Sequence, residues 1–189
     1  MIHRFKQLTS LPNLLTCSRF ILAPILLYLA WQGSKNSFLI LLAITFFTDV
    51  LDGFAARLLN QTSELGAYLD TLADLFVYTT LAISVWWLWP EIVRREIAYV
   101  LLTIISYISP IVFGYLKFHA LTSYHTWLVK LAVVLLGITF FVLFIFDIAW
   151  PFHIAAITCL LAAIEEIAIS YYLTEPQSNI RSLWHLIRC

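Results

Sequence analysis

The sequence predicts an all-α fold, a polytopic membrane helix bundle with six transmembrane helices in a single domain over residues 1–189. Of these 189 residues, 62% are hydrophobic and 12% are charged, and the mean hydropathy is +0.90. Long apolar runs alternate with short polar segments, as expected of helices that cross a bilayer. The net charge is zero, so composition indicates no nucleic-acid partner. The three cysteines lack the spacing of a disulfide framework or a zinc site.

Six apolar segments form the predicted spans in chain order. We expect them over residues 11–31, 37–59, 63–89, 97–116, 127–146 and 150–173, with polar turns over residues 32–36, 60–63, 90–96 and 117–126. Residues 1–10 fit either a short juxtamembrane helix on the membrane surface or a plain cationic tail. Residues 174–189 fit a short surface segment.

The distribution of positive charge predicts which side of the membrane each turn faces. Six spans place both termini on one side, and eight of the eleven Lys and Arg residues belong to that side: Arg4, Lys6, Arg19, Arg57, Lys117, Lys130, Arg181 and Arg188. The positive-inside bias therefore predicts that both termini are cytosolic, as is the turn between the second and third spans.

A dense acidic group surrounds this turn, between two apolar runs. It reads Asp49-x2-Asp52-Gly53-x2-Ala56-Arg57, then eight residues, then Gly66-x3-Asp70-x3-Asp74. On a helix, Asp49 and Asp52 fall on one face, and Asp70 and Asp74 fall on one face of the next helix. If residues 60–63 connect two antiparallel helices, the four carboxylates converge at one depth in the membrane.

The charge of this group predicts a metal site. Four converging carboxylates repel one another, and pairing with Arg57 and the few lysines of the chain cannot neutralise all of them. Carboxylate oxygen atoms favour a hard cation, and a cluster of four suits two ions better than one. We therefore expect two Mg²⁺ or Mn²⁺ ions.

The pattern closely resembles the signature of the CDP-alcohol phosphatidyltransferase family, integral-membrane enzymes of phospholipid synthesis, and all eight signature positions match. The resemblance implies that the four aspartates are the metal ligands and that Asp74 is also the catalytic general base. It implies a homodimer and a nucleotide and diphosphate site that includes Gly53, Ala56, Arg57 and Gly66. Alternatively, the small residues only let helices pack closely.

Two further groups of residues are assigned by the same resemblance. Asn13 and Thr16, in the phrase Pro12-Asn13-Leu14-Leu15-Thr16, resemble the start of the family's first span, which borders the nucleotide pocket. They also suit plain helix caps. Lys117, His125 and Lys130 stand on the side of the acceptor alcohol, where the family carries basic residues.

The implied reaction is transfer of a phosphatidyl group from CDP-diacylglycerol to a small alcohol such as glycerol 3-phosphate, serine or inositol phosphate, with release of CMP. Transfer from a CDP-alcohol to diacylglycerol uses the same aspartates and stays open. Leu75 stands where phosphatidylglycerophosphate synthases commonly have Lys, which weakens the glycerol-phosphate assignment. A divalent-cation transporter accounts for the aspartates but not for Arg57 or the small residues beside them.

Other ionisable residues lie at a similar depth to the aspartates. Arg19 is about eight residues, or about 12 Å, from the cytosolic end of the first predicted span. Lys130, Glu165 and Glu166 fall in the same cytosolic half. This layer predicts a water-filled cavity open to the cytosol, or, for the glutamates, simple structural pairing with Arg19 or Lys130.

Overall fold

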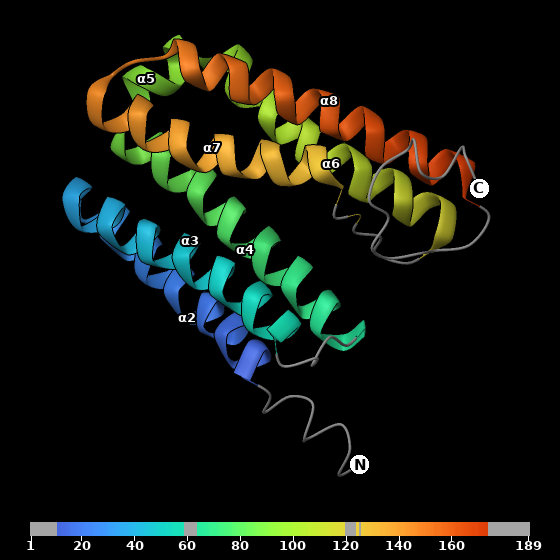
Figure 1. The fold of residues 1–189 in the computed structure, drawn as a ribbon. Helices are drawn as coiled ribbons and strands as arrows, with labels where there is room; N and C mark the ends of the chain where they lie inside the picture. Colours follow the sequence, from blue (N-terminus) through green and yellow to red (C-terminus); the bar gives the residue numbers. More distant parts are fainter. Residues whose placement is uncertain (1–10, 59–63, 120–123, 125, 174–189) are drawn as a thin grey trace. The chain divides into compact units, whose positions relative to one another are not determined.

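A computed structural model describes residues 11–58, 64–119, 124 and 126–173, and in these residues every regular element is a helix (Figure 1). The prediction of an all-α fold is therefore confirmed for this part of the chain. Seven helices are described: α2 (Leu11–Trp31), α3 (Lys35–Leu58), α4 (Glu64–Leu88), α5 (Pro90–Arg95), α6 (Ile97–Phe118), α7 (Trp127–Phe146) and α8 (Trp150–Tyr172). A helix or tail over residues 1–10 and a surface segment over 174–189 lie outside the described residues.

One predicted turn is wrong, because residues 90–95 form the short helix α5. Pro90 is suited to the first helical position, where a missing N–H costs nothing. Glu91 in the first turn and Arg94 and Arg95 in the last turn have the charges that the helix dipole favours. The polar residues that suggested a turn therefore stabilise both ends of a helix.

Four segments are long and apolar enough to cross a membrane: Thr71–Leu88, Ile97–Phe118, Trp127–Phe146 and Trp150–Tyr172. In the described parts of α2 and α3, the apolar stretches Thr16–Trp31 and Lys35–Thr48 are shorter. The prediction of six full spans thus stays a prediction for the first two helices.

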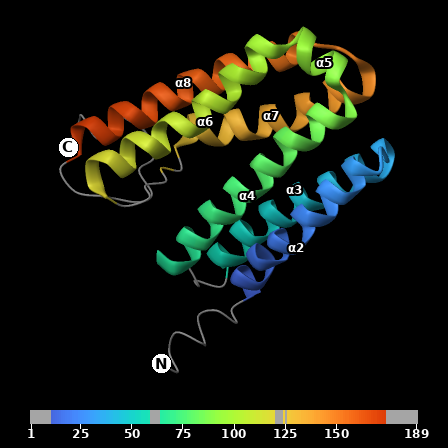
Figure 2. The same ribbon diagram turned by 180° about the vertical axis from the view of Figure 1, so that it is seen from behind.

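The chain groups into an N-terminal unit, Met1–Pro90, and a C-terminal unit, Glu91–Cys189. The single domain expected over residues 1–189 stays a prediction. In the N-terminal unit, α2 packs against both α3 and α4, and Figure 2 shows these three helices from behind. The buried positions recur at helical spacing, with Ala23, Leu26 and Ala30 on α2 and Ala73 and Val77 on α4.

In the C-terminal unit, α8 packs against both α6 and α7. Its buried face is rich in small residues, which allow helices to approach closely: Ala155, Ala156, Ala162, Ala163 and Ser170. Large apolar side chains point outward instead, including Leu116, Ile138 and Ile164. An apolar outer surface around a core of small residues is the arrangement expected of helices in lipid.

A polar network joins four helix ends of the C-terminal unit, those of α5, α6, α7 and α8. The Arg95 guanidinium donates to Asp147, which follows α7, and its Nε donates to Glu96 Oε1 at 2.9 Å. The other oxygen of the buried Glu96 lies 2.7 Å from His153 Nε2 on α8, and the His153 ring stacks on Tyr99. The hydrogen bond with Asp147, and then the one with Glu96, raises the pKa of Arg95.

We expect Glu96→Gln to lower the melting temperature in detergent at pH 7 by about 2–6 °C, since it weakens two hydrogen bonds of a buried group. Burial raises the pKa of Glu96, but the hydrogen bonds with His153 and Arg95 outweigh it and hold this pKa below its ordinary value of 4.5. The stability that depends on Glu96 is thus present above pH 4.5 and lost as the pH falls through the lowered pKa. The difference in melting temperature between Glu96→Gln and the wild type should disappear as the pH falls through the lowered pKa.

The exposed Glu91 on α5 supplies a matched control. Glu91→Gln removes one carboxylate without removing a buried hydrogen bond, so its melting temperature should stay close to that of the wild type. A Glu96→Gln difference that stays constant over the whole acid titration of the wild type would show that the carboxylate charge is not what stabilises this network.

Candidate metal and nucleotide site

The two halves of the acidic motif lie on consecutive helices of the N-terminal unit. Asp49, Asp52, Gly53, Ala56 and Arg57 belong to the last three turns of α3, and Gly66, Asp70 and Asp74 to the first three turns of α4. The connection of residues 59–63 is short, so both halves lie at one end of this unit (Figure 1). The side chains of Asp49, Asp52, Gly53, Ala56, Arg57 and Asp70 lie outside those that the structure describes, as does the predicted turn itself.

Asp74 forms an ion pair with Arg19 of α2, whose Nη1 donates to Asp74 Oδ1. The Arg19 side chain is 2% exposed and that of Asp74 is 30% exposed. A guanidinium buried this deeply among apolar helices needs an opposite charge, which Asp74 supplies. The sequence placed both residues at a similar depth but considered Glu165 and Glu166, and not Asp74, for pairing with Arg19.

A small recess opens beside this ion pair. It is lined by Arg19, Thr45, Phe46, Asp74, Val77 and Tyr78, and its volume of about 10 Å³ is close to that of one water molecule. This recess is therefore too small for a nucleotide. Thr16 lies one turn before Arg19 on α2 and is also buried, while the Asn13 side chain is outside the described set.

Of the four predicted metal ligands, the structure describes the side chain of Asp74 alone. Among the described side chains, no three His, Cys, Asp or Glu residues are grouped so that they could hold a metal ion. Three of the four predicted ligands are not in that set, so the metal prediction stays untested. Their chemistry fits a hard cation, because all four donors are carboxylates. A carboxylate has two oxygens and about four lone-pair sites, so the contact of Asp74 with Arg19 leaves it able to bind a metal.

Two residues predicted for the acceptor side are described in the C-terminal unit. Lys117 Nζ donates to the backbone oxygens of Ser170 at 2.9 Å and Tyr171 at 2.7 Å, which caps the last turn of α8. Lys130 Nζ lies 4.9 Å from the ring centre of Trp127, so this cation rests over an aromatic face. His125 lies outside the described residues.

Sequence reasoning missed the contact of Glu165 on α8. The hydroxyl of Thr126 donates to Glu165 Oε2 at 2.8 Å. The sequence signal was weak, since Thr126 is one of several hydroxyl residues in a polar loop. Its one distinguishing feature is its place directly before an apolar run, where Thr is a favoured N-cap.

Comparison with known proteins identifies the class. An all-α, multi-pass membrane protein with this acidic motif is expected to match membrane phospholipid synthases. The family model described as CDP-alcohol phosphatidyltransferase matches residues 9–164, which is most of the chain. The chain therefore belongs to the CDP-alcohol phosphatidyltransferase family, and it is an integral, multi-pass membrane protein.

Curated relatives match over shorter stretches. A CDP-diacylglycerol--glycerol-3-phosphate 3-phosphatidyltransferase of Aquifex aeolicus is 46% identical over 65 residues, which is 34% of this chain and 36% of the relative. A cardiolipin synthase (CMP-forming) of Rattus norvegicus is 46% identical over 76 residues, 40% of this chain and 25% of the relative. The matched stretches thus span about a third and a quarter of these relatives. No solved structure matches the chain.

Proposed function

We propose that the protein transfers a phosphatidyl group from CDP-diacylglycerol to the hydroxyl group of an alcohol, with release of CMP, as a step of phospholipid synthesis. The observation that carries the proposal is the complete acidic motif at adjoining ends of α3 and α4, inside the region that the family model matches. The names of the relatives favour glycerol 3-phosphate or phosphatidylglycerol as the acceptor. They also favour CDP-diacylglycerol, and not a CDP-alcohol, as the donor.

The proposed reaction assigns a role to each motif residue. Mg²⁺ or Mn²⁺ ions held by Asp49, Asp52, Asp70 and Asp74 would offset the negative charge that develops on the two phosphates. Asp74 accepts the proton of the attacking hydroxyl as its oxygen bonds to the phosphorus and the bond from that phosphorus to the CMP oxygen breaks. Arg19 holds one oxygen of Asp74 and so orients this carboxylate.

The remaining motif residues bind the donor in this proposal. Arg57 contacts the diphosphate as a fixed cation, and Gly53, Ala56 and Gly66 leave room for the nucleotide beside the helix backbones. Asn13 and Thr16 border the same pocket. Lys117, His125 and Lys130 are proposed for the acceptor side, although Lys117 also caps α8. We further propose six spans, cytosolic termini, a cytosolic active site and a homodimer.

Purified protein supplied with CDP-diacylglycerol and Mn²⁺ tests the reaction directly. We expect CMP release that depends on radiolabelled glycerol 3-phosphate or on phosphatidylglycerol, with the label in a new phospholipid. Leu75 beside Asp74 makes the comparison of these two acceptors informative, because an apolar side chain there cannot pair with the free phosphate of glycerol 3-phosphate. Absence of CMP release with both acceptors, in protein that binds CMP, would contradict both acceptor assignments.

We expect Arg57→Ala and Gly66→Leu each to weaken the use of CDP-diacylglycerol by about ten-fold or more, for different reasons. The first variant loses a charged phosphate contact, and Arg57→Lys should restore it in part because the charge returns without the planar fork. The second fills the space proposed for the nucleotide. Titration of the purified variants with CMP distinguishes a local loss of nucleotide binding from general damage to the fold. An unchanged CMP affinity in Gly66→Leu would place the nucleotide elsewhere.

A further inference from the structure

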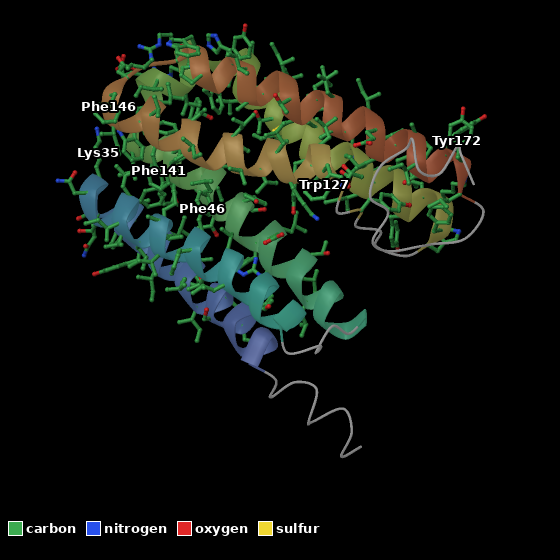
Figure 3. The ribbon with its side chains drawn as sticks, viewed as in Figure 1. Lys35, Phe46, Trp127, Phe141, Phe146 and Tyr172 are labelled. Atoms are coloured by element: carbon green, nitrogen blue, oxygen red, sulfur yellow. The ribbon has the colours of Figure 1, made fainter. Side chains whose placement is uncertain are left out.

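The end of α8 holds both sides of the α6–α7 connection in the C-terminal unit. On the α6 side, Lys117 donates to the backbone oxygens of Ser170 and Tyr171. On the α7 side, Tyr124 and Thr126 contact residues of the last three turns of α8. Figure 3 shows Trp127 at the start of α7 and Tyr172 near the end of α8. The described residues on both sides of this connection, Lys117, Tyr124 and Thr126, are therefore held by α8.

Thr126 is the most fully buried of these contacts, with no exposed surface. Its hydroxyl group accepts from the backbone N–H of Val129 at 3.2 Å, which caps the first turn of α7, and donates its own proton to Glu165 Oε2 at 2.8 Å. The Thr126 hydroxyl group thus caps the N-terminus of α7 and links this helix to a carboxylate on α8. The donor role requires an oxygen acceptor at position 165, because the hydroxyl has a single proton.

Tyr124 is held by two kinds of contact with α8. Its phenol oxygen accepts from Ser170 Oγ at 3.1 Å. The residue is 2% exposed and packs in an apolar cluster with Ile169 and Leu173, against which Phe118 also packs. The end of α8 therefore holds both Tyr124 and Thr126, and Glu165 takes part although a carboxylate in a membrane helix is costly to keep.

Basic residues of the proposed acceptor side flank the α6–α7 connection. Lys130 stands one turn beyond Thr126 on α7, and Lys117 stands in the last turn of α6. Their positions relative to one another depend on where α7 begins, which Thr126 and Glu165 set. A binding site for an anionic alcohol built from these residues would require this geometry.

We propose that Glu165 is a positioning residue, which holds Thr126 and the start of α7 so that Lys117 and Lys130 bind the acceptor alcohol. The proposal rests on the proposed function, since it takes these basic residues as the acceptor side. Glu165 does not touch the substrate. Its carboxylate acts through the Thr126 hydroxyl, and so governs acceptor affinity and not donor affinity.

The test compares the KM for the acceptor with the KM for CDP-diacylglycerol in paired variants of the full chain. Glu165→Leu and Thr126→Val remove the hydrogen bond, and each should raise the acceptor KM by about ten-fold or more with little change in the donor KM. Glu165→Gln and Thr126→Ser keep an oxygen acceptor and a hydroxyl donor, so they should largely restore the acceptor KM. Thr139→Val is the matched control, because this buried Thr on α7 donates to Leu135 O of its own helix.

Hydrogen exchange of the first turn of α7 gives a readout that does not need activity. We expect faster exchange in Glu165→Leu and Thr126→Val than in wild type, Thr139→Val and the two conservative variants. Unchanged exchange, or equal increases in donor and acceptor KM in folded protein, would overturn the positioning role. A wild-type protein that releases no CMP contradicts the proposed function, and the exchange result then still decides whether Glu165 holds the start of α7.

Discussion

Asp74→Asn is expected to lower the single-turnover rate by about 10²–10⁴, the usual contribution of general-base catalysis, and to leave binding of CDP-diacylglycerol largely intact. The amide oxygen of Asn can still accept from the Arg19 guanidinium and bind a metal ion. It cannot take the proton of the attacking hydroxyl at neutral pH. The variant therefore separates the base function of this residue from its contribution to the site's geometry.

The experiment measures both the single-turnover rate and the affinity for CDP-diacylglycerol at saturating Mn²⁺, in Asp74→Asn and Asp49→Asn side by side. Asp49→Asn should lose activity because it binds the metal ion more weakly, and part of the activity should return as the Mn²⁺ concentration is raised. Arg19→Lys keeps the positive charge beside Asp74 and is expected to retain more activity than Arg19→Met. Turnover near that of the wild type in Asp74→Asn, or equal losses of donor affinity in both Asp variants, would exclude a distinct base at this position.

The second large effect is expected on metal dependence. Asp49→Asn, Asp52→Asn and Asp70→Asn should each raise the Mn²⁺ concentration for half-maximal activity by at least about ten-fold, since even partners outside the ligand set change metal affinity by 10–100-fold. The physical reason is the loss of one anionic oxygen ligand in a site built from carboxylates. The change of shape from Asp to Asn is small, so the fold should be retained.

The experiment is a titration of activity with Mn²⁺ in the three variants. Their melting temperatures are measured in the same detergent. Glu91→Gln serves as the control, because it removes an exposed carboxylate from α5 and should leave the Mn²⁺ dependence unchanged. Wild-type Mn²⁺ dependence in all three Asp variants would rule out the two-metal site, and the four aspartates would then need another role.

The sequence was most informative where a feature depends on one helix at a time. The bounds of α2 and α7 were predicted to the residue, because apolar runs that end at polar residues or at Pro mark where a helix leaves lipid. The motif was found in the same way, since the spacing of Asp49 and Asp52, or of Asp70 and Asp74, fixes a shared face on a helix. The short helix α5 was missed because its capping charges resemble those of a turn.

Contacts between helices were decided by the tertiary structure. The spacing of Arg19 sets its depth and face on α2, but a buried cation can pair with any carboxylate at that depth, and packing of α2 against α4 selects Asp74. Glu165 likewise had charged residues as its expected partners, yet packing of α7 on α8 brings it the Thr126 hydroxyl. Periodicity gives the direction of a side chain within its own helix, whereas the neighbour that it meets depends on which helices pack together and in what register.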